Sequence, residues 1–238
     1  MHSEPKRAPR ARRDEVWRSL FERQSPAVAL GMCQEFQRGI ALAGLEAARM
    51  PRPRSLSRRL HDLCGWRIET VPGLIPAAEF FALLRDRRFP SPDWIRHPDD
   101  LEYTPEPDAF HDLFGHVPQL ASAKFGNVLE QLASAARGAD AEELTAIERV
   151  YWFTIEFGLV RENDAVKALG AGLASSIAEL DRALHAPAIE RRRFMLSNAR
   201  QSPFETDRPQ ELYMVADSLE GLVADLHIES WDRVRRAG

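Results

Sequence analysis

The chain has 238 residues, of which 44% are hydrophobic and 29% charged, and a formal net charge of −4. These values are typical of one sizeable globular domain, and the acidic balance argues against a general nucleic-acid binder, because phosphate binding needs a surplus of Lys and Arg. No apolar run approaches the roughly 20 residues that span a bilayer, and no secretory signal is recognisable. With two cysteines, a reduced cytoplasmic protein without nucleic-acid or membrane partners is expected.

The first half of the chain predicts helices separated by proline-rich breaks. Residues 1–14, which contain the basic run Lys6–Arg13, are expected to form a disordered tail before a single domain over residues 15–238. Apolar periodicity predicts helices over residues 15–23, 27–49, 55–63 and 77–87, the second starting at Ser25–Pro26 and the third capped by Ser55 or Ser57. Residues 66–71 alternate as a short strand. Residues 89–107 hold five prolines and predict a long ordered loop, which is usually functional.

The second half is also mostly helical by the same criteria. Helices are predicted over residues 108–114, 141–157, 164–186, 188–198 and 218–226, and residues 213–215 form a strand candidate. Asp108 and Asp140 are predicted to cap the first two of these helices. The expected fold class is therefore mainly α, in one domain with a minor β element.

Two histidines in this second half could bind a metal. His111 and His116 lie five residues apart, which is roughly 140° around an α-helix, so they do not share a face as residues four apart do. Both can bind one ion only if the helix loosens near Gly115 or if His116 lies where the helix ends. The alternative is a structural pair of histidines on a half-buried helix.

A carboxylate on a later segment strengthens the metal interpretation. The segment Val150–Gly158 is apolar nearly all round, which indicates a buried helix, and Glu156 lies near its end. An ionised carboxylate buried there costs several kcal/mol unless a cation pairs with it, and an arginine is the alternative partner. Two imidazoles and one carboxylate match the facial triad of non-haem iron(II) oxygenases. Zinc could use the same ligands, although no Glu follows a histidine with the spacing of zinc proteases.

Several sequence blocks identify a family. The segment from Pro72 to about Leu180 resembles the catalytic domain of the pterin-dependent aromatic amino acid hydroxylases, with the bacterial phenylalanine hydroxylases as the most similar branch. The matching blocks are Pro72–Leu74, Trp94–His97, Tyr103–Asp108, His111–Pro118, Tyr151–Leu159 and Gly170–Ser176. The resemblance implies that the chain hydroxylates the ring of a free aromatic amino acid with Fe(II), a tetrahydropterin such as tetrahydrobiopterin, and dioxygen as co-substrate.

The resemblance also assigns roles to individual residues. It implies that Fe(II) is held by His111, His116 and Glu156, with Tyr151 close to the metal. The pterin would contact five residues, of which Phe80 stacks on its ring: Leu74, Ile75, Ala77, Phe80 and Asp112. The amino acid would meet Arg96 at its carboxylate, Thr104 beside it and Trp152 around its ring. Ser175 would orient a ligand histidine from behind.

The substrate is predicted from one position. Trp152 matches the phenylalanine and tyrosine enzymes of the family, which favours conversion of L-phenylalanine to L-tyrosine. Tryptophan 5-hydroxylation and meta-hydroxylation of phenylalanine are the alternatives within the family, because residues 204–211 match it only loosely. A zinc-dependent hydrolase or lyase and an inactive binding homologue are alternatives of another class. The length of the chain leaves no room for the regulatory domain and oligomerisation helix of the mammalian members, so a monomer is expected.

Overall fold

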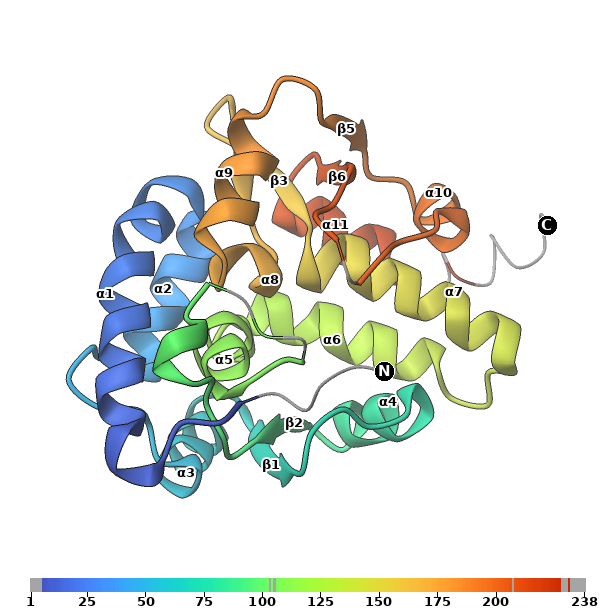
Figure 1. Cartoon of the computed structure of the whole chain (residues 1–238). Coiled ribbons are helices and arrows are strands. Elements are labelled where there is room, and N and C mark those ends of the chain that lie inside the picture. The colour runs from blue at the N-terminus through green and yellow to red at the C-terminus, as the bar shows by residue number, and fades with distance from the viewer. Residues whose placement is uncertain (1–5, 103, 105, 207, 228–230, 232–238) are drawn as a thin grey trace.

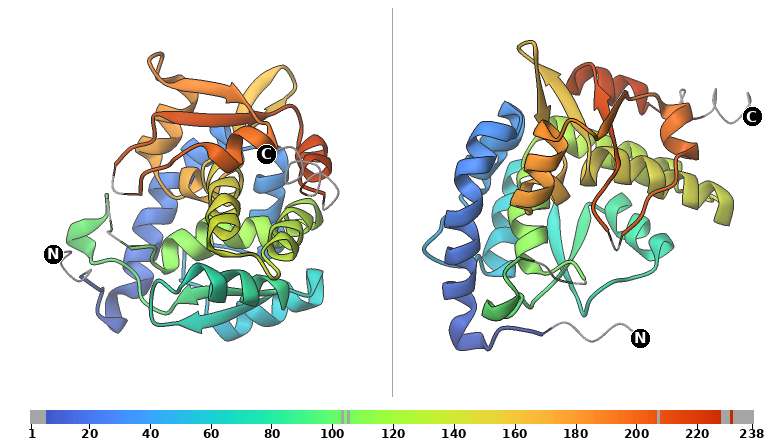
Figure 2. Two further views of the ribbon diagram at one scale, coloured as in Figure 1. Left: turned by 90° about the vertical axis from the view of Figure 1, so that its right-hand side faces the viewer. Right: turned by 45° about the horizontal axis from the view of Figure 1, so that its top comes forward.

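The computed structural model describes residues 6–227 apart from 103, 105 and 207, together with Trp231. Helices fill the middle of the molecule, and two small sheets lie on opposite sides of them (Figure 1 and the left view of Figure 2). The α-helices are α1 (Arg13–Gly31), α2 (Gln34–Ala43), α3 (Pro53–Cys64), α4 (Ala77–Arg85), α5 (Val117–Leu120), α6 (Ala123–Ala135), α7 (Ala141–Tyr151), α8 (Ala171–Ala174), α9 (Ile177–His185), α10 (Leu196–Gln201) and α11 (Leu219–Asp225). The expected mainly α fold with a minor β element is confirmed.

The remaining elements are short helices and strands. The helices of other types are η1 (Arg10–Arg12), η2 (Pro98–Asp100), η3 (His111–His116) and η4 (Trp152–Glu156). The strands are β1 (Arg67–Val71), β2 (Arg88–Pro92), β3 (Leu159–Glu162), β4 (Ala165–Ala168), β5 (Glu190–Arg193) and β6 (Leu212–Ala216). Among the described residues, the strands form one sheet of order β1-β2 and another of order β4-β3-β6-β5.

The N-terminal basic segment is ordered where the structure describes it. Ala8 N–H donates to the carbonyl of Ile95 at 2.8 Å, and the Arg7 guanidinium lies 5.0 Å from the centroid of the Trp94 ring. The prediction of a disordered tail over residues 1–14 is therefore wrong from residue 6 onward, and residues 1–5 lie outside the described part. Local composition did not reveal the pairing, because its partner segment lies about 90 residues later in the chain.

The first long helix does not end where the proline suggested. α1 continues through Pro26, and the Ser25 hydroxyl donates to the carbonyl of Phe21 at 2.6 Å. The break falls instead after Gly31, where the backbone of Met32 is extended. The third helix likewise begins at Pro53, with Arg52 as its cap in place of the expected Ser55 or Ser57. Tertiary packing of an apolar face thus outweighs a local start signal.

β1 and β2 form a small parallel sheet, and α4 lies in the crossover between them. β2 lies inside the segment that was predicted to be a loop, and its Pro90 and Pro92 are accommodated because each strand of a two-stranded sheet is an edge. The crossover from β1 through residues 72–76 to α4 brings these residues beside the central helices (Figure 1). This unit forms one wall of the cavity described below.

Parts of two segments that were predicted to be helical are strands of the second sheet. β3 and β4 form an antiparallel hairpin whose turn residues Asn163 and Asp164 both have positive φ, as a two-residue hairpin turn requires. The helix predicted over residues 164–186 is therefore wrong at its start, and α8 and α9 occupy only its later part. The helix predicted over residues 188–198 is instead β5 followed by α10, because β5 pairs in parallel with the distant β6.

A close contact between helices supports the centre of the molecule. α2 packs on α5 at Gly39, where a Cβ atom would lie 2.0 Å from the carbonyl oxygen of Pro118. Only glycine permits this approach. Pro118 follows His116 by two residues, so the contact supports the metal-ligand segment from behind. Within the described residues, no helix is both long and apolar enough to cross a membrane.

Candidate active site

The two histidines lie on a π-helix. In η3 (His111–His116) a backbone N–H donates to the carbonyl five residues earlier. Val117 N–H, for example, donates to the carbonyl of Asp112. The wider turn brings residues five apart nearer to one face than an α-helix does. The expected loosening near Gly115 is thus confirmed. Asp108 begins the segment, since its carboxylate accepts the backbone N–H of His111 at 3.0 Å.

The carboxylate comes from a second π-helix. η4 (Trp152–Glu156) continues α7, and Phe157 N–H donates to the carbonyl of Trp152 at 2.8 Å. The following turn is held tightly, because a Cβ atom on Gly170 would lie 2.1 Å from the Glu156 carbonyl oxygen. π-helical turns are rare and occur frequently at functional sites. Here each of the two turns carries metal-ligand candidates.

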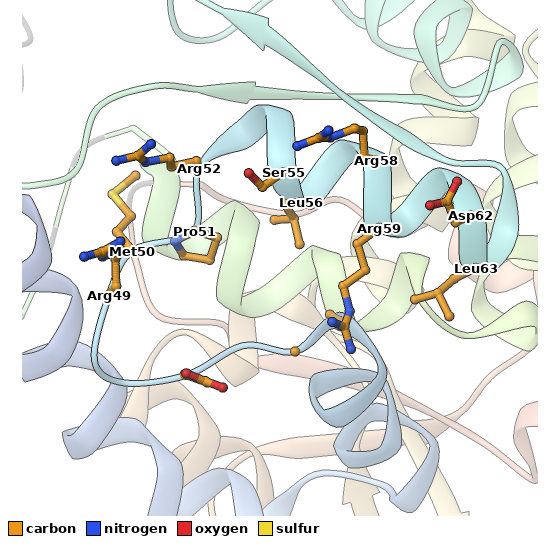
Figure 3. A pocket seen from close by; sticks show the side chains of 13 residues that line it. Arg49, Met50, Pro51, Arg52, Ser55, Leu56, Arg58, Arg59, Asp62 and Leu63 are labelled. Carbon is orange, nitrogen blue, oxygen red and sulfur yellow. The ribbon is translucent and has the colours of Figure 1, made fainter.

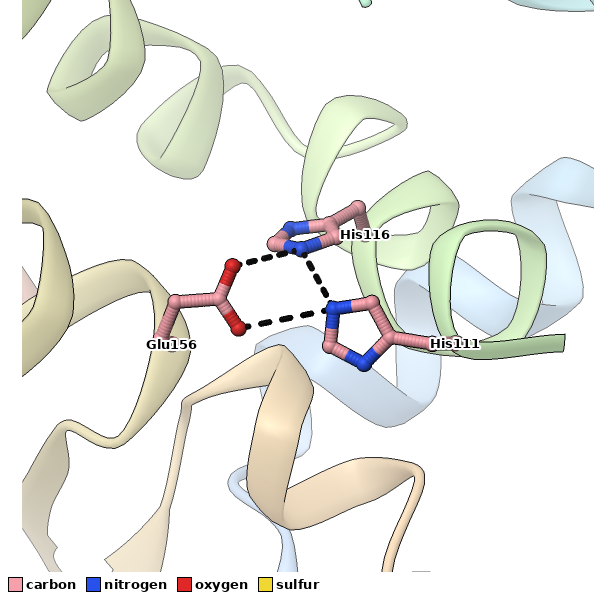
Figure 4. A group of neighbouring side chains, drawn as sticks. All are labelled: His111, His116 and Glu156. Atoms are coloured by element: carbon pink, nitrogen blue, oxygen red, sulfur yellow. Dashed lines mark hydrogen bonds and ion pairs between the residues drawn. The ribbon is translucent and has the colours of Figure 1, made fainter. Parts of the chain in front are cut away.

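The three side chains converge on one point (Figure 4). Glu156 Oε1 lies 2.9 Å from His116 Nε2, and Glu156 Oε2 lies 3.5 Å from His111 Nε2. The two Nε2 atoms are 3.2 Å apart. One ligand atom from each residue falls within 4.8 Å of the others, which is compact enough for a single metal ion.

Two polar residues behind the histidines determine which ring nitrogen carries hydrogen. Ser175 Oγ donates to the carbonyl of Ala171 and therefore accepts from His111 Nδ1, 2.9 Å away. Gln119 donates its amide to two backbone carbonyls, at Ile155 and Leu169, so its oxygen accepts from His116 Nδ1 at 3.1 Å. Both Nε2 lone pairs then face the Glu156 carboxylate.

This arrangement attracts positive charge. Two nitrogen lone pairs and a carboxylate that point at one another repel unless a proton on an imidazole or a metal ion lies between them. Two neutral imidazoles and one carboxylate are the donor set that suits non-haem Fe(II), with coordination positions left for other ligands. The side chains of His111, His116 and Glu156 therefore fit the predicted iron site.

We expect Gln119→Leu to weaken iron binding. The leucine keeps the volume but removes the acceptor for His116 Nδ1–H and both donors to the neighbouring carbonyls, and loss of such outer-shell partners typically costs about 10–100-fold in metal affinity. Anaerobic titration with Fe(II) against a competing chelator measures the change. Gln37→Leu is the matched control, because Gln37 also donates to two carbonyls, at Ala29 and Met32. Equal iron affinity in the two variants would contradict the role of Gln119.

The carboxylates of the site have unusual pKa values. Burial raises the pKa of Glu156, but the positive charge that His116 and His111 carry when protonated outweighs it, so the net pKa of Glu156 lies well below its ordinary value. Burial raises the pKa of Asp112 to about 6, against the opposing influence of the same histidines. Burial and the Glu156 charge raise the pKa of Tyr151 well above its ordinary value. Glu156 is therefore ionised and Tyr151 neutral near pH 7.

A cavity of about 330 Å³ opens beside the three ligands. Its wall contains all five residues predicted to contact the pterin, together with Tyr151 and Trp152. The Phe80 ring meets the Tyr151 ring edge-on, with centroids 5.3 Å apart. The structure thus brings together ten of the thirteen predicted site residues around one cavity. These ten are Leu74, Ile75, Ala77, Phe80, His111, Asp112, His116, Tyr151, Trp152 and Glu156.

The other three predicted residues lie outside the cavity wall. Ser175 is behind His111, as expected of an orienting group. Arg96 is buried, and its guanidinium forms a bidentate ion pair with the fully buried Asp108. A third N–H of Arg96 donates to the carbonyl of Leu101 at 3.3 Å. The Thr104 hydroxyl donates to the carbonyl of Glu106 at 2.9 Å and so shapes a turn.

The structure adds site residues that the sequence did not reveal. Phe204 and Thr206 line the cavity from a segment that matched the family only loosely. The Phe204 ring stacks on Trp152 with centroids 4.4 Å apart, and the Trp152 indole N–H donates to Gln210 Oε1 at 2.9 Å. Glu148 also lines the cavity. Only for Glu148 was there a signal, since it precedes Trp152 by one helical turn.

A larger hollow lies elsewhere, beside α3 (Figure 3). It has a volume of about 900 Å³ and no lining residue in common with the cavity at the ligands. Four arginines line it: Arg49, Arg52, Arg58 and Arg59. Two of them have partners within the protein, since Arg49 lies 3.9 Å from Asp14 and Arg59 donates to the carbonyl of Leu42. The candidate active site is therefore the smaller cavity, which contains the convergent ligands.

Comparison with known proteins gives a consistent result. Residues 8–233 match the family described as biopterin-dependent aromatic amino acid hydroxylase. A phenylalanine-4-hydroxylase of Ralstonia nicotianae is 38% identical over 210 residues, which are 87% of this chain and 66% of that protein. The phenylalanine-4-hydroxylase of Caulobacter vibrioides is 37% identical over 209 residues, which are 87% and 71% of the two chains.

A solved structure agrees in three dimensions. Phenylalanine hydroxylase from Chromobacterium violaceum, with bound iron(III) and 7,8-dihydrobiopterin, superposes with a TM-score of 0.88 at 33% identity. The match covers 100% of this chain and 89% of that one. Together with the two π-helical turns, the three convergent ligands and the aromatic cavity, these similarities show that the chain belongs to the biopterin-dependent aromatic amino acid hydroxylases, monooxygenases that depend on iron and a reduced pterin.

Proposed function

We propose that this chain hydroxylates the ring of free L-phenylalanine to give L-tyrosine. The observation that supports the proposal is the cavity itself, which is lined by the His111–His116–Glu156 set, the Phe80 ring and the Trp152 ring. A metal site, a platform for a flat heterocycle and an aromatic wall for a second ring are what the reaction requires. The dependence on iron and a pterin belongs to the family.

The residues of the chain position the reactants. His111, His116 and Glu156 would hold Fe(II), which together with the reduced pterin supplies the activation of dioxygen. The ring of Phe80 would stack on the pterin while the backbone of residues 74–77 and the side chain of Asp112 contact its edge. The aromatic wall excludes water, which protects reactive species from side reactions.

Arg96 remains the proposed partner of the substrate carboxylate. Three of its five N–H groups donate to Asp108 and Leu101, and the others have no partner among the described residues. The ion pair with Asp108 holds the guanidinium in one orientation, which favours a bidentate contact with a carboxylate. Thr104 would contribute a hydroxyl contact from the same loop, if the hydrogen bond to Glu106 is exchanged on binding.

Purified protein tests this function directly. The protein is incubated under air with Fe(II), a tetrahydropterin and L-phenylalanine, and the products are separated by chromatography, with a reaction lacking pterin as control. We expect tyrosine that depends on the pterin. meta-Tyrosine, or turnover of tryptophan alone, would refute the proposed substrate and keep the family. Product without pterin or oxygen would support the hydrolase or lyase alternative instead.

We expect Trp152→Phe to relax the selectivity between ring sizes. The smaller ring enlarges the cavity and leaves Gln210 Oε1 without its indole donor. Turnover of tryptophan relative to phenylalanine should rise roughly tenfold, since small changes of shape in an apolar pocket are worth about 1–3 kcal/mol. Ratios of kcat/KM for the two amino acids measure this change. The control is Trp17→Phe, which removes an indole donor to the carbonyl of Glu46 away from the cavity. An unchanged ratio in Trp152→Phe would show that Trp152 does not contact the substrate ring.

A monomeric state also stays a prediction. Sedimentation velocity of the purified chain at micromolar concentration measures it, and a concentration-dependent increase of the sedimentation coefficient would contradict it.

A further inference from the structure

A small hollow between α3 and β1 carries a concentration of positive charge. Its volume is about 270 Å³, and Arg54, Arg58 and Arg67 line it. Among the described residues, no Asp or Glu lines this hollow, whereas the larger hollow beside the same helix includes Glu46 and Asp62 (Figure 3). The small hollow also shares no lining residue with the active-site cavity, so its charge has no part in the chemistry described above.

The three guanidinium groups have no partner within the described part of the protein. The side chains of Arg54, Arg58 and Arg67 form no hydrogen bond and no ion pair there. The neighbouring Arg88, in contrast, lies 3.4 Å from Glu69 of the same sheet. Arg54 and Arg58 are four residues apart on α3, where two like charges repel each other. Three uncompensated charges thus lie beside one hollow, although the net charge of the chain is −4.

Neutral donors complete the lining of the hollow. The Ser57 hydroxyl accepts the N–H of Ile68 at 3.1 Å, which leaves its own hydrogen to donate. Successive N–H groups of a strand point to opposite edges, so the N–H of Thr70 lies on the same edge of β1 as that of Ile68. The Thr70 hydroxyl and the His61 ring also line the hollow, and His61 Nδ1 lies 3.6 Å from Asp62. The groups that face the hollow are therefore mainly hydrogen-bond donors.

This set of donors suits an oxyanion that carries more than one charge. The planar fork of a guanidinium binds two oxygens of a phosphate at once. A single carboxylate carries one charge and would leave two of the three arginines uncompensated. A volume of about 270 Å³ lies just below the range of pockets that hold drug-sized ligands, and so suits a phosphate group with few further atoms.

We propose that the hollow between α3 and β1 binds a phosphate dianion, either free or as the end of a small phosphate ester, through Arg54, Arg58 and Arg67. The ligand removes the repulsion between the arginines, which the protein alone does not offset. The site lies apart from the iron and pterin cavity and needs neither cofactor. The inference is therefore independent of the substrate proposed above.

Calorimetry at constant ionic strength tests the proposal. The Fe(II)-loaded protein is titrated under nitrogen with inorganic phosphate and, separately, with glycerol 3-phosphate. We expect saturable binding that Arg54→Gln and Arg67→Gln each weaken roughly tenfold, as loss of a hydrogen-bonded charge does. The control is Arg59→Gln, which removes the same charge from α3 outside the hollow, at a guanidinium that donates to the carbonyl of Leu42. This control should keep the wild-type affinity, and any phosphate that binds the iron contributes equally to all variants.

Thermal unfolding gives a second measurement that does not depend on activity. Phosphate should raise the Tm of the wild-type protein above its value in chloride at equal ionic strength, because a ligand of the folded state stabilises it. In chloride, Arg58→Gln should be at least as stable as the wild-type protein, since it relieves repulsion, yet phosphate should raise its Tm less. The general stabilising effect of phosphate is common to both proteins. A lower Tm of Arg58→Gln in both salts by the same amount would indicate a purely structural arginine and overturn the proposal.

The two phosphate compounds separate the sources of the ligand. Tighter binding of glycerol 3-phosphate than of phosphate would support a small ester, and equal or weaker binding would support the free ion. Equal weakening by Arg54→Gln and Arg59→Gln would show a general effect of charge and overturn the site. The proposal also fails if neither compound binds saturably. A DNA duplex that binds through the same arginines while both small phosphates do not would overturn it in favour of a surface for polyanions.

Discussion

Glu156→Gln is expected to abolish iron binding and turnover together while the domain stays folded. The amide has the shape of the carboxylate but no charge, so two imidazole lone pairs and a neutral oxygen remain for the metal. The loss of affinity should exceed the roughly 10–100-fold that removal of an outer-shell partner causes, because Glu156 is predicted to bind the metal directly. Iron content after dialysis and pterin-dependent product formation measure the two effects, and circular dichroism measures folding.

The control for this variant is on the same helical segment. Glu142→Gln makes the same chemical change at an exposed position in the first turn of α7. It should leave iron content and activity as in the wild-type protein. Iron that stays bound in Glu156→Gln at wild-type affinity would show that the carboxylate is no ligand, and the convergence of the three side chains would then need another explanation.

Asp108→Ala is expected to cause the largest loss of stability. Asp108 is fully buried and accepts hydrogen bonds from the backbone N–H, Nε and Nη2 of Arg96 and from the backbone of His111. Its removal leaves the buried guanidinium of Arg96 without a counter-charge, which costs about 3–5 kcal/mol. The first ligand histidine also loses the cap of its π-helical turn. Urea unfolding should therefore show a much lower free energy of unfolding, and iron titration a weaker site.

An exposed pair provides the comparison. Asp217→Ala removes the partner of Arg193 at the surface, where such a pair is worth about 0–1 kcal/mol. A loss for Asp108→Ala no larger than for Asp217→Ala would contradict the structural role of the buried pair.

The buried pair also predicts how stability depends on pH. Burial raises the pKa of Asp108, but the charge of Arg96 and the hydrogen bonds from Arg96 outweigh it, so the net pKa is below its ordinary value. A carboxyl whose pKa is lowered on folding contributes fully above its unfolded pKa of about 4. This contribution is lost as the pH falls through the lower native pKa. Wild-type stability should therefore fall more steeply than that of Asp108→Ala below about pH 4, as urea unfolding at several pH values can measure.

The chemistry of the metal site could be predicted from the sequence because its ligands form local patterns. Each pattern spans only a few residues: the two histidines with Gly115, and the apolar segment before Glu156. The five-residue spacing of the histidines alone indicated that the helix must loosen between them. The role of Gln119 could not be predicted from the sequence, because it depends on the carbonyls of Ile155 and Leu169, which lie 36 and 50 residues away. A glutamine between apolar residues has no local signature of such a contact.

Arg96 shows that the partner of a charged side chain could not be predicted from the sequence alone. The sequence offered Asp93, Asp99 and Asp100 as surface partners, and the structure pairs the guanidinium with the buried Asp108 instead. The contact with the substrate carboxylate stays a prediction. Phe204 and Thr206 form a wall of the cavity because the loop before β6 folds back over Trp152, a position that no pattern within residues 204–211 indicates.

By itself, the sequence determined the helical character of the chain, the position of most helices and the three candidate metal ligands that the fold brings together. Periodicity, capping residues and metal-ligand types act over a few residues, so they can be read without the fold. Only the tertiary structure decided that residues 6–8 pair with residues 95–97, that prolines lie within β2, and that residues 190–193 form a strand. In each of these cases the backbone hydrogen bonds go to a partner distant in sequence, and the partner's position is a property of the whole packed chain.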